Sequence, residues 1–182
     1  MIQAGHQIGL HSQTHPHVES VQTQAQINDE IIQNVDIVKQ KLNVTTKYFR
    51  PPYGTIGART RQALGQFLGQ DSQIMLWSVD IRDWVFGVDE QTGDPDRQQY
   101  KAYVEGVEKG GDIVVMHNLY NSTVDQFRDM IRYAKKKGKK FVRMDQCVGD
   151  KDAPESWGWK RNGNGSERSL IGGGDGTPYY WV

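Results

Sequence analysis

The chain has almost no cysteine, no long apolar run and no excess of charge of either sign. Its 182 residues include one cysteine, 22 basic and 22 acidic residues. Balanced charge gives no electrostatic footprint for nucleic acid or for an anionic membrane surface. No apolar stretch reaches the ~20 residues of a membrane-spanning helix. Residues 1–6 lack the basic and apolar regions of a signal peptide. Taken literally, this predicts a cytoplasmic protein, or equally one whose true beginning is absent.

The length allows one domain with a sizeable core and is too short for two ordinary domains. In a secreted protein the lone Cys147 would lack its partner, whereas in a cytosolic protein it would be a small buried side chain. Glycosylation sequons begin at Asn43, Asn121 and Asn164. Short sequons often arise by chance, so they favour secretion only mildly.

Apolar and charged segments alternate along the chain in a pattern of strands and helices. Strands are expected at residues 7–10, 47–49, 74–79, 112–115 and 141–144. No hairpin signal separates them, which indicates a parallel α/β sheet with five strands, fewer than a closed barrel needs. Periodicity disappears from Val148 onward. We therefore expect a domain over residues 1–147 and an irregular tail, with glycine and aromatic residues, over 148–182.

Helices are expected where apolar residues recur at a spacing of three or four. The first should begin at a capping box of Thr23 and Gln26, and the second should cover residues 58–68. The third should begin at Asp94, and the fourth at Thr123. The side chains expected to face inward are Ile27, Ile31, Val35, Val38 and Leu42, then Ala63, Leu64, Phe67 and Leu68, then Tyr103, Val104 and Val107, and finally Val124, Phe127, Ile131 and Ala134.

Four short motifs each place reactive side chains directly after an expected strand. They are HSQTH at residues 11–15, RPPY at 50–53, DIRDW at 80–84 and VMH at 115–117. An α/β barrel or an open α/β sheet builds its active site at the carboxyl ends of successive strands. Unrelated surface residues have no reason to share this position, so the set predicts a metal-dependent hydrolase.

His11 and His15 are four residues apart, and their separation depends on the local backbone. On a continuing strand they would lie about 13 Å apart, whereas in a turn they approach within roughly 6 Å and can share one metal ion. Pro16 blocks the strand and favours the turn. A catalytic zinc takes three protein ligands, so at least one is unaccounted for. The alternative is a pair of solvent-facing loop histidines, as expected for His6 and His17.

The other motif residues also have ordinary structural explanations. Arg50 could end a strand and face water, but the rigid diproline after it could present the Tyr53 amide as a fixed oxyanion donor. Asp83 could form a turn or cap a helix, and Trp84 could belong to the core. His117 could be an edge histidine, or a general acid if a carboxylate holds its other ring nitrogen.

Taken in this order, the motifs resemble the polysaccharide deacetylases, the NodB-homology domains of carbohydrate esterase family 4. The family patterns H-[ST]-x-x-H, R-x-P-Y, D-x-x-[DN]-W and [LV]-x-H match residues 11–15, 50–53, 80–84 and 115–117. The resemblance covers residues 5–150, and residues 145–150 look most like the end of fungal chitin deacetylases. It implies a distorted (β/α) barrel. Because the family's initial Asp-Asp strand is absent, the barrel is expected to be N-terminally incomplete.

The resemblance also implies a role for each motif. A divalent metal ion, zinc first with cobalt or manganese as alternatives, would be held by His11, His15 and an aspartate of the absent segment. Arg50 would orient the catalytic base, which also belongs to that segment. The Tyr53 amide would bind the oxyanion.

The later motifs would serve the leaving group and the acyl group. By the same resemblance, His117, paired with Asp83, would protonate the departing amine. Trp84 and Val115 would enclose the acetyl methyl group. A disulfide partner of Cys147 would lie in the absent part.

The implied activity is N-deacetylation of an N-acetylglucosamine polymer, with chitin or a chitooligosaccharide as the glycan partner. The full-length protein would be secreted or held in a cell wall. The absence of the base predicts impaired activity in this chain. Two alternatives stay open: a non-catalytic pseudoenzyme that at most binds glycan, and a deacetylase of peptidoglycan or acetylated xylan. The sequence gives no information on oligomeric state.

Overall fold

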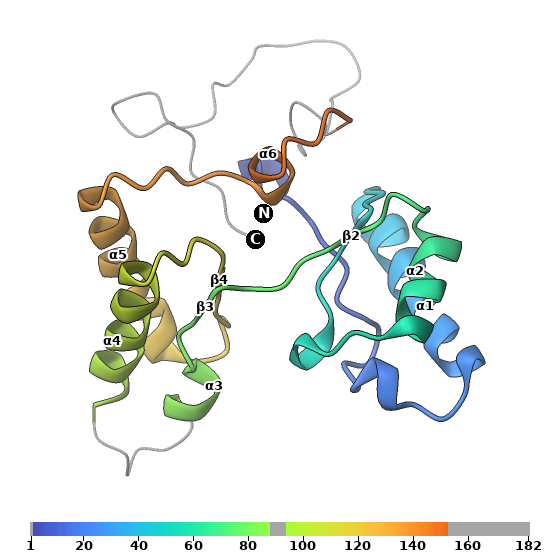
Figure 1. Cartoon of the computed structure of the whole chain (residues 1–182), viewed down its shortest axis with the longest axis horizontal. Helices are drawn as coiled ribbons and strands as arrows, with labels where there is room; N and C mark the ends of the chain where they lie inside the picture. Colours follow the sequence, from blue (N-terminus) through green and yellow to red (C-terminus); the bar gives the residue numbers. More distant parts are fainter. Residues whose placement is uncertain (1, 88–93, 153–182) are drawn as a thin grey trace. The chain divides into compact units, whose positions relative to one another are not determined.

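The computed structural model describes residues 2–87 and 94–152, which fall into two compact units (Figure 1). Unit 1 comprises Met1–Met75 with Phe141–Val182, and unit 2 comprises Leu76–Lys140. The expected tail begins at Val148, and its residues 153–182, with both glycine-rich stretches, lie outside the described residues. Within the described part, no helix is both long and apolar enough to cross a membrane.

The described residues of unit 1 form three α-helices, two strands and three 3-10 helices. In chain order these are η1 (Ile2–Ala4), η2 (Val18–Ser20), α1 (Gln24–Leu42), β1 (Tyr48–Phe49), η3 (Pro52–Gly54), α2 (Ala58–Phe67), β2 (Gln73–Ile74) and α6 (Met144–Cys147). Unit 2 contains β3 (Val79–Asp80), α3 (Asp83–Phe86), α4 (Pro95–Glu108), β4 (Val114–Val115) and α5 (Asn121–Lys136).

Each unit is built on a parallel pair of short strands. In unit 1, β1 pairs with β2 in the register Phe49↔Ile74, and Leu10 forms a parallel bridge to Phe49 from the other side. In unit 2, β3 pairs with β4 in the register Val79↔Val114. These pairings confirm the parallel α/β arrangement that the alternation of strands and helices predicts.

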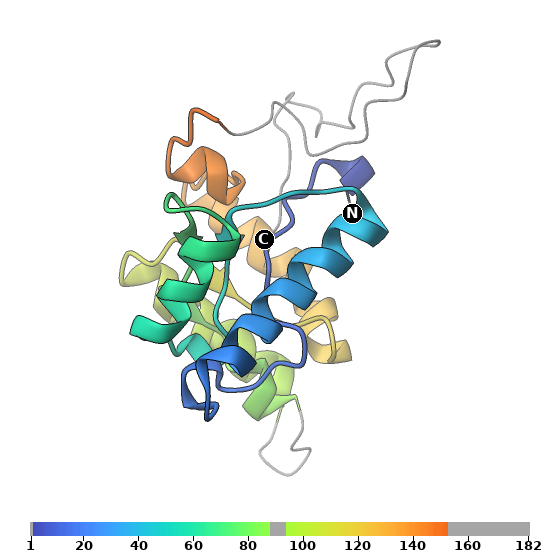
Figure 2. The same ribbon diagram turned by 90° about the vertical axis from the view of Figure 1, so that its right-hand side faces the viewer.

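The core of unit 1 lies between the strands and helices α1 and α2, which run side by side in Figures 1 and 2. The capping box of Thr23 and Gln26 is present, and α1 ends at Asn43 in the left-handed conformation. Most of the expected inner face is correct, but Leu42 is 39% exposed because it lies at the end of the last turn. The fully buried members of the cluster are Leu10, Val18, Ile27, Ile31, Phe49, Ala63 and Leu64.

In unit 2, α4 packs against β3 and α5. The helix begins as predicted, with the Asp94 side chain accepting a hydrogen bond from the Arg97 N–H and with Pro95 in the first turn. Gly106 allows the close approach of α4 to the strand, since a Cβ there would lie only 2.6 Å from Val79 Cγ1. Tyr103 and Val107 are buried on this face, as expected.

Three of the expected strands are wrong in extent. Of residues 7–10, only Leu10 forms a bridge. The run 74–79 is divided, because the Met75 N–H donates to the Phe49 carbonyl whereas the Val79 N–H donates to the Ile113 carbonyl. The chain therefore leaves one strand pair and joins another within this run.

The last expected strand, residues 141–144, does not form. Residues 141–143 have no regular secondary structure, and Met144 is the first residue of α6. Arg143 caps α6, where its backbone N–H donates to Gln146 and its buried guanidinium pairs with Asp145 at 2.9 Å. These local bonds satisfy polar groups that a strand would pair with a neighbour. Cys147 ends this helix and is exposed, so it is not the small buried residue of the cytosolic alternative.

Helix α5 begins at Asn121, two residues before Thr123. Its expected inner face is correct at Ala134, half-buried at Phe127 and Ile131, and wrong at Val124. Thr123, Met130 and Ala134 are buried, while Val124 is 57% exposed. Thr123 turns inward because its hydroxyl donates to the buried carboxylate of Asp83. The next residue, Val124, is about 100° further around the helix and faces solvent.

Replacing Val124 by serine tests the exposure of this side chain. Because the side chain is mostly exposed, V124S is expected to change the free energy of unfolding by no more than about 0.5 kcal/mol. Had Val124 been a core residue, losing its two methyl groups would cost well above 1 kcal/mol. Equilibrium urea unfolding of V124S and the parent chain measures the difference, and a cost of about 2 kcal/mol would contradict the observed face.

Candidate functional site

Residues 11–15, here called the histidine loop, bring two imidazoles together. The ring centroids of His11 and His15 lie 4.8 Å apart, edge to face. The loop turns because Ser12 and His15 both adopt the left-handed conformation, with φ of 64° and 62°. The Ser12 hydroxyl oxygen accepts the His15 N–H at 3.1 Å and closes the turn. The close approach expected from the H-x-x-x-H spacing is therefore observed, while the metal-binding role stays a prediction.

The carbonyl oxygen of Arg50 fixes the orientation of His11. It lies 2.6 Å from His11 Nδ1 and can only accept, so Nδ1 carries the proton. In the neutral ring, the lone pair is then on Nε2. A backbone carbonyl in this position is the usual partner of a metal-binding histidine.

The guanidinium of Arg50 is a second notable feature beside the histidine loop. Its Nε and Nη2 atoms are buried and have no hydrogen-bond partner among the described residues. Burial lowers the pKa of Arg50. A buried cation without a partner is unfavourable unless a carboxylate pairs with it. The side chain is therefore placed to receive an anionic group.

Tyr53 adds a strained backbone and an aromatic contact. Its φ is 56°, in the left-handed region that side-chain-bearing residues rarely adopt and that clusters at functional sites. The side chain is 58% exposed, stacks on His17 at 3.8 Å between centroids and contacts His15 edge to face at 4.9 Å. The sequence motif predicts a role for the Tyr53 amide, but it does not predict that the Tyr53 ring stacks on His17.

The donor set fits a divalent metal such as zinc in type. Two imidazoles are preferred zinc ligands, but a catalytic zinc takes three protein ligands. Within residues 2–87 and 94–152, no group of three His, Cys, Asp or Glu side chains gathers closely enough to hold an ion. His11 and His15 would supply two ligands of such a site, and the third would have to come from another group.

In unit 2, the buried Asp83 and the partly exposed His117 form an acid–imidazole pair. The carboxylate of Asp83 is completely buried, and its Oδ1 lies 2.8 Å from His117 Nδ1. The same carboxylate accepts the backbone N–H of His117 and that of Trp84, as well as the hydroxyl of Thr123. The ring is thereby fixed with Nδ1 protonated, so in the neutral ring the lone pair is on Nε2.

Burial alone would raise the pKa of Asp83, but hydrogen bonds from His117 and Thr123 outweigh it and lower the pKa. A carboxylate with a depressed folded-state pKa stabilises the fold above its unfolded pKa, and this contribution is lost as pH falls through the folded value. We therefore expect D83N to lose part of the acid dependence of the unfolding free energy below about pH 4. Urea unfolding between pH 2 and 6 tests this. Parallel profiles for D83N and the parent chain would contradict it.

The remaining predicted residues differ in exposure. Trp84 follows Asp83 on α3 and is 55% exposed, so it is not a core residue, whereas Val115 at the end of β4 is buried. The sequence reasoning missed Thr123 as an Asp83 partner. The Thr-x-x-Gln pattern at Thr123 predicts a helix cap, so it gives no indication that the threonine hydroxyl contacts Asp83.

The predicted site residues are divided between the two units. His11, His15, Arg50 and Tyr53 belong to unit 1, and Asp83, Trp84, Val115 and His117 belong to unit 2. Each group is assembled within its own unit. That all eight line one cleft stays a prediction.

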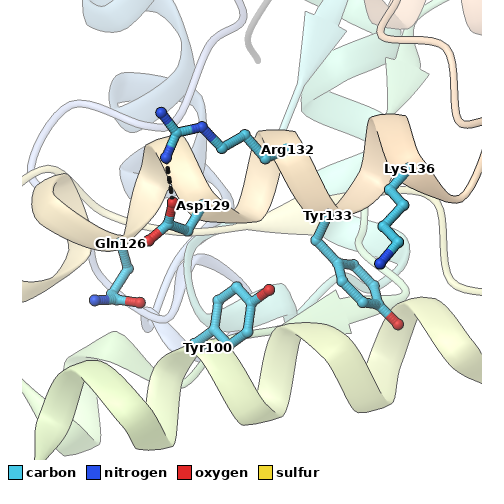
Figure 3. Close-up of a pocket in the computed structure, with 6 residues that line it drawn as sticks. All are labelled: Tyr100, Gln126, Asp129, Arg132, Tyr133 and Lys136. Carbon is cyan, nitrogen blue, oxygen red and sulfur yellow. Dashed lines mark hydrogen bonds and ion pairs between the residues drawn. The ribbon is translucent and has the colours of Figure 1, made fainter.

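A surface groove of about 420 Å³ in unit 2 lies apart from these motifs (Figure 3). In Figure 3, Arg132 and Asp129 form an ion pair at 2.9 Å on α5. The lining residues are Tyr100, Gln126, Asp129, Arg132, Tyr133 and Lys136. None of them belongs to a sequence motif, so the groove is not the candidate site.

Two parallel α/β units thus carry the close pair of His11 and His15 and the hydrogen-bonded pair of Asp83 and His117. Residues 1–69 match the family model "Polysaccharide deacetylase". The chain is 26% identical over 150 residues to peptidoglycan-N-acetylglucosamine deacetylase PgdA of Listeria monocytogenes, which covers 82% of this chain and 29% of that protein. It is 28% identical over 166 residues to chitin deacetylase 1 of Saccharomyces cerevisiae, which covers 86% and 50%.

Solved structures show the same fold. A family 4 carbohydrate esterase pseudoenzyme from Bacillus anthracis superposes with a TM-score of 0.64 at 22% identity, over 76% of this chain and 44% of that chain. Residues 1–69 are therefore similar to the polysaccharide deacetylases, and the chain has the distorted (β/α) fold of a family 4 carbohydrate esterase structure, as its motifs predict. It spans between 29% and 50% of the length of the two curated relatives.

Proposed function

We propose that this chain is the part of a hydrolytic deacetylase domain, over residues 1–147, that cleaves acetamide groups of an N-acetylglucosamine polymer. The observation that carries the proposal is the histidine loop, where His11 and His15 lie 4.8 Å apart and the carbonyl of Arg50 fixes the His11 ring. The Asp83–His117 pair supports it independently. These are the residue types that metal-assisted amide hydrolysis requires.

The metal would be held by His11 Nε2 and by His15, with zinc first and cobalt or manganese as alternatives. When bound, the ion polarises the acetamide carbonyl and lowers the pKa of its bound water. The orientation of His11 supports this role because its Nδ1 is already engaged by the Arg50 carbonyl.

The other residues would bind the reacting groups and move protons. The backbone N–H of Tyr53 donates to the developing oxyanion. The left-handed conformation of Tyr53 changes the direction of this N–H from that in an extended strand. The Arg50 guanidinium pairs with a carboxylate that acts as the base. His117, protonated on Nε2 and held by Asp83, gives its proton to the departing amine. Trp84 and Val115 contact the acetyl methyl group.

The substrate would be chitin or a chitooligosaccharide, and the full-length protein would act outside the cell or in a cell wall. One relative is named for peptidoglycan and the other for chitin, and both glycans contain N-acetylglucosamine. Acetate release from chitin oligomers, peptidoglycan fragments and acetylated xylan, compared in parallel, would identify the substrate.

Zinc titration with matched histidine variants tests the proposed site. His15 contacts His11 in the loop, whereas His17 is an exposed neighbour stacked on Tyr53. In isothermal titration calorimetry, we expect H15A to lower zinc affinity by at least about 10-fold, because one of two imidazole ligands is lost. H17A should bind zinc as the parent chain does. Equal affinities for H15A and H17A would refute the site.

A non-catalytic, glycan-binding function is the second candidate. The observation that favours it is that the described residues offer two metal-type ligands rather than three. Binding of chitin oligomers without acetate release in the presence of zinc would support this candidate. Zinc-dependent acetate release would support the first.

A further inference from the structure

The histidine loop is held to helix α1 by one carboxylate. Glu30 Oε2 accepts the backbone N–H groups of Gln13 at 3.0 Å and Thr14 at 2.8 Å. Its Oε1 accepts the Thr14 hydroxyl at 2.6 Å. Two of the three residues between His11 and His15 therefore donate hydrogen bonds to Glu30. Hydrogen bonds to a charged acceptor are among the strongest in proteins.

A second acceptor on the same helix fixes the start of the loop. Asn34 Oδ1 accepts the backbone N–H of His11 at 3.0 Å. Asn34 is one helical turn after Glu30, so the two side chains face the loop together. The helix itself is anchored, because Ile27 and Ile31, each three residues before one of these acceptors, are essentially buried.

The loop needs such anchoring because of its backbone. Ser12 and His15 both have φ above 60°, a conformation that L-residues other than glycine rarely adopt. Backbone of this kind persists only where surrounding contacts over-determine it. Glu30 binds the two residues that lie between these strained positions, and it can therefore hold both in place.

We propose that Glu30 is the positioning residue of the histidine loop, which sets the approach of His11 and His15 and thereby their joint affinity for a metal ion; this rests on the proposed function. Glu30 lies outside all four sequence motifs. It would act through the loop backbone and touch neither metal nor substrate. Outer partners of metal ligands typically change metal affinity 10–100-fold when removed.

The test compares zinc affinity in E30A, E30Q and D29A. E30A removes all three hydrogen bonds, and we expect affinity to fall at least about 10-fold. E30Q keeps one oxygen for the two backbone N–H groups, and its amide can donate to the Thr14 hydroxyl, so affinity should stay within about 3-fold of the parent. D29A removes the same charge from the adjacent, exposed helix position and should leave affinity unchanged.

These variants separate positioning from a general charge effect. Equal losses in E30A, E30Q and D29A would mean that Glu30 acts only through its negative charge and would overturn the proposal. So would an E30A affinity equal to that of the parent. Circular dichroism checks folding. If E30A does not fold, T14V, which removes only the hydroxyl bond, should still lower zinc affinity about 2- to 3-fold, and an unchanged affinity would then overturn the proposal.

A metal-free measurement distinguishes failure of this proposal from failure of the proposed function. Nuclear Overhauser contacts between the His11 and His15 rings report their approach directly. We expect them in the parent chain and E30Q, and expect their loss in E30A or weakening in T14V. If the parent binds no zinc, the metal role fails while the ring contacts still decide the role of Glu30. Persistent ring contacts in E30A would overturn it.

Discussion

Acetate release from chitin oligomers by the 182-residue chain, with zinc or cobalt added, should be at least about 10²-fold slower than by a family member that carries the Asp-Asp segment. The physical reason lies in the histidine loop and Arg50. Among the described residues, two imidazoles are available for the metal, and no carboxylate pairs with Arg50 Nε or Nη2. Loss of a general base alone commonly costs a factor of 10²–10⁴.

The matched control is the same chain extended by a segment carrying the two aspartates, assayed with the same metal. Restored turnover in the extended chain would show that the residues described here are otherwise competent. Turnover by the 182-residue chain equal to that of the extended one would contradict the prediction. It would mean that another carboxylate, from this chain or from a second copy, supplies the base.

Local sequence signals predicted the elements that depend on neighbouring residues. The capping box of Thr23 and Gln26 and the Asp94 cap appear as expected, because a cap needs only residues within one turn. The same applies to the histidine loop, whose turn forms within residues 12–15, directly before Pro16. The approach of His11 and His15 followed from this turn.

The sequence-based predictions are wrong where contacts between residues distant in sequence determine the local structure. Thr123 reads as a helix cap, yet its hydroxyl donates to Asp83, 40 residues earlier, and this turns α5 so that Val124 faces solvent. The run 74–79 reads as one strand, but its two ends pair with different partners. Neither partner can be identified from spacing alone.

In the candidate site, too, residues in local motifs could be predicted, whereas a residue that acts through distant contacts could not. The motif residues could be found from the sequence because each motif is contiguous. Glu30 could not, because its contacts with Gln13 and Thr14 cross 16 to 17 residues and its helix position carries no distinctive pattern. A glutamate on a helix is ordinarily a solvated side chain. Only the folded loop shows what this one holds.

Replacing Asp83 by alanine should lower the free energy of unfolding by about 3–5 kcal/mol, because it removes a buried carboxylate and leaves several hydrogen-bond donors without their acceptor. The side chain is completely buried, and its two oxygens accept the His117 ring and backbone N–H groups, the Trp84 N–H and the Thr123 hydroxyl. D83A leaves these donors without that acceptor. D83N keeps one carbonyl oxygen and should cost less, about 1–3 kcal/mol.

The control is D129A, which removes an exposed carboxylate paired with Arg132 in the same unit and should cost less than about 1 kcal/mol. Equilibrium urea unfolding at pH 7 provides the comparison. A D83A cost no larger than that of D129A would show that Asp83 does not organise this part of the fold. A large cost would connect stability with chemistry, because the carboxylate that joins α3, β4 and α5 also fixes the tautomer of His117. The imidazole would then be held for proton transfer by the same bonds that hold the unit together.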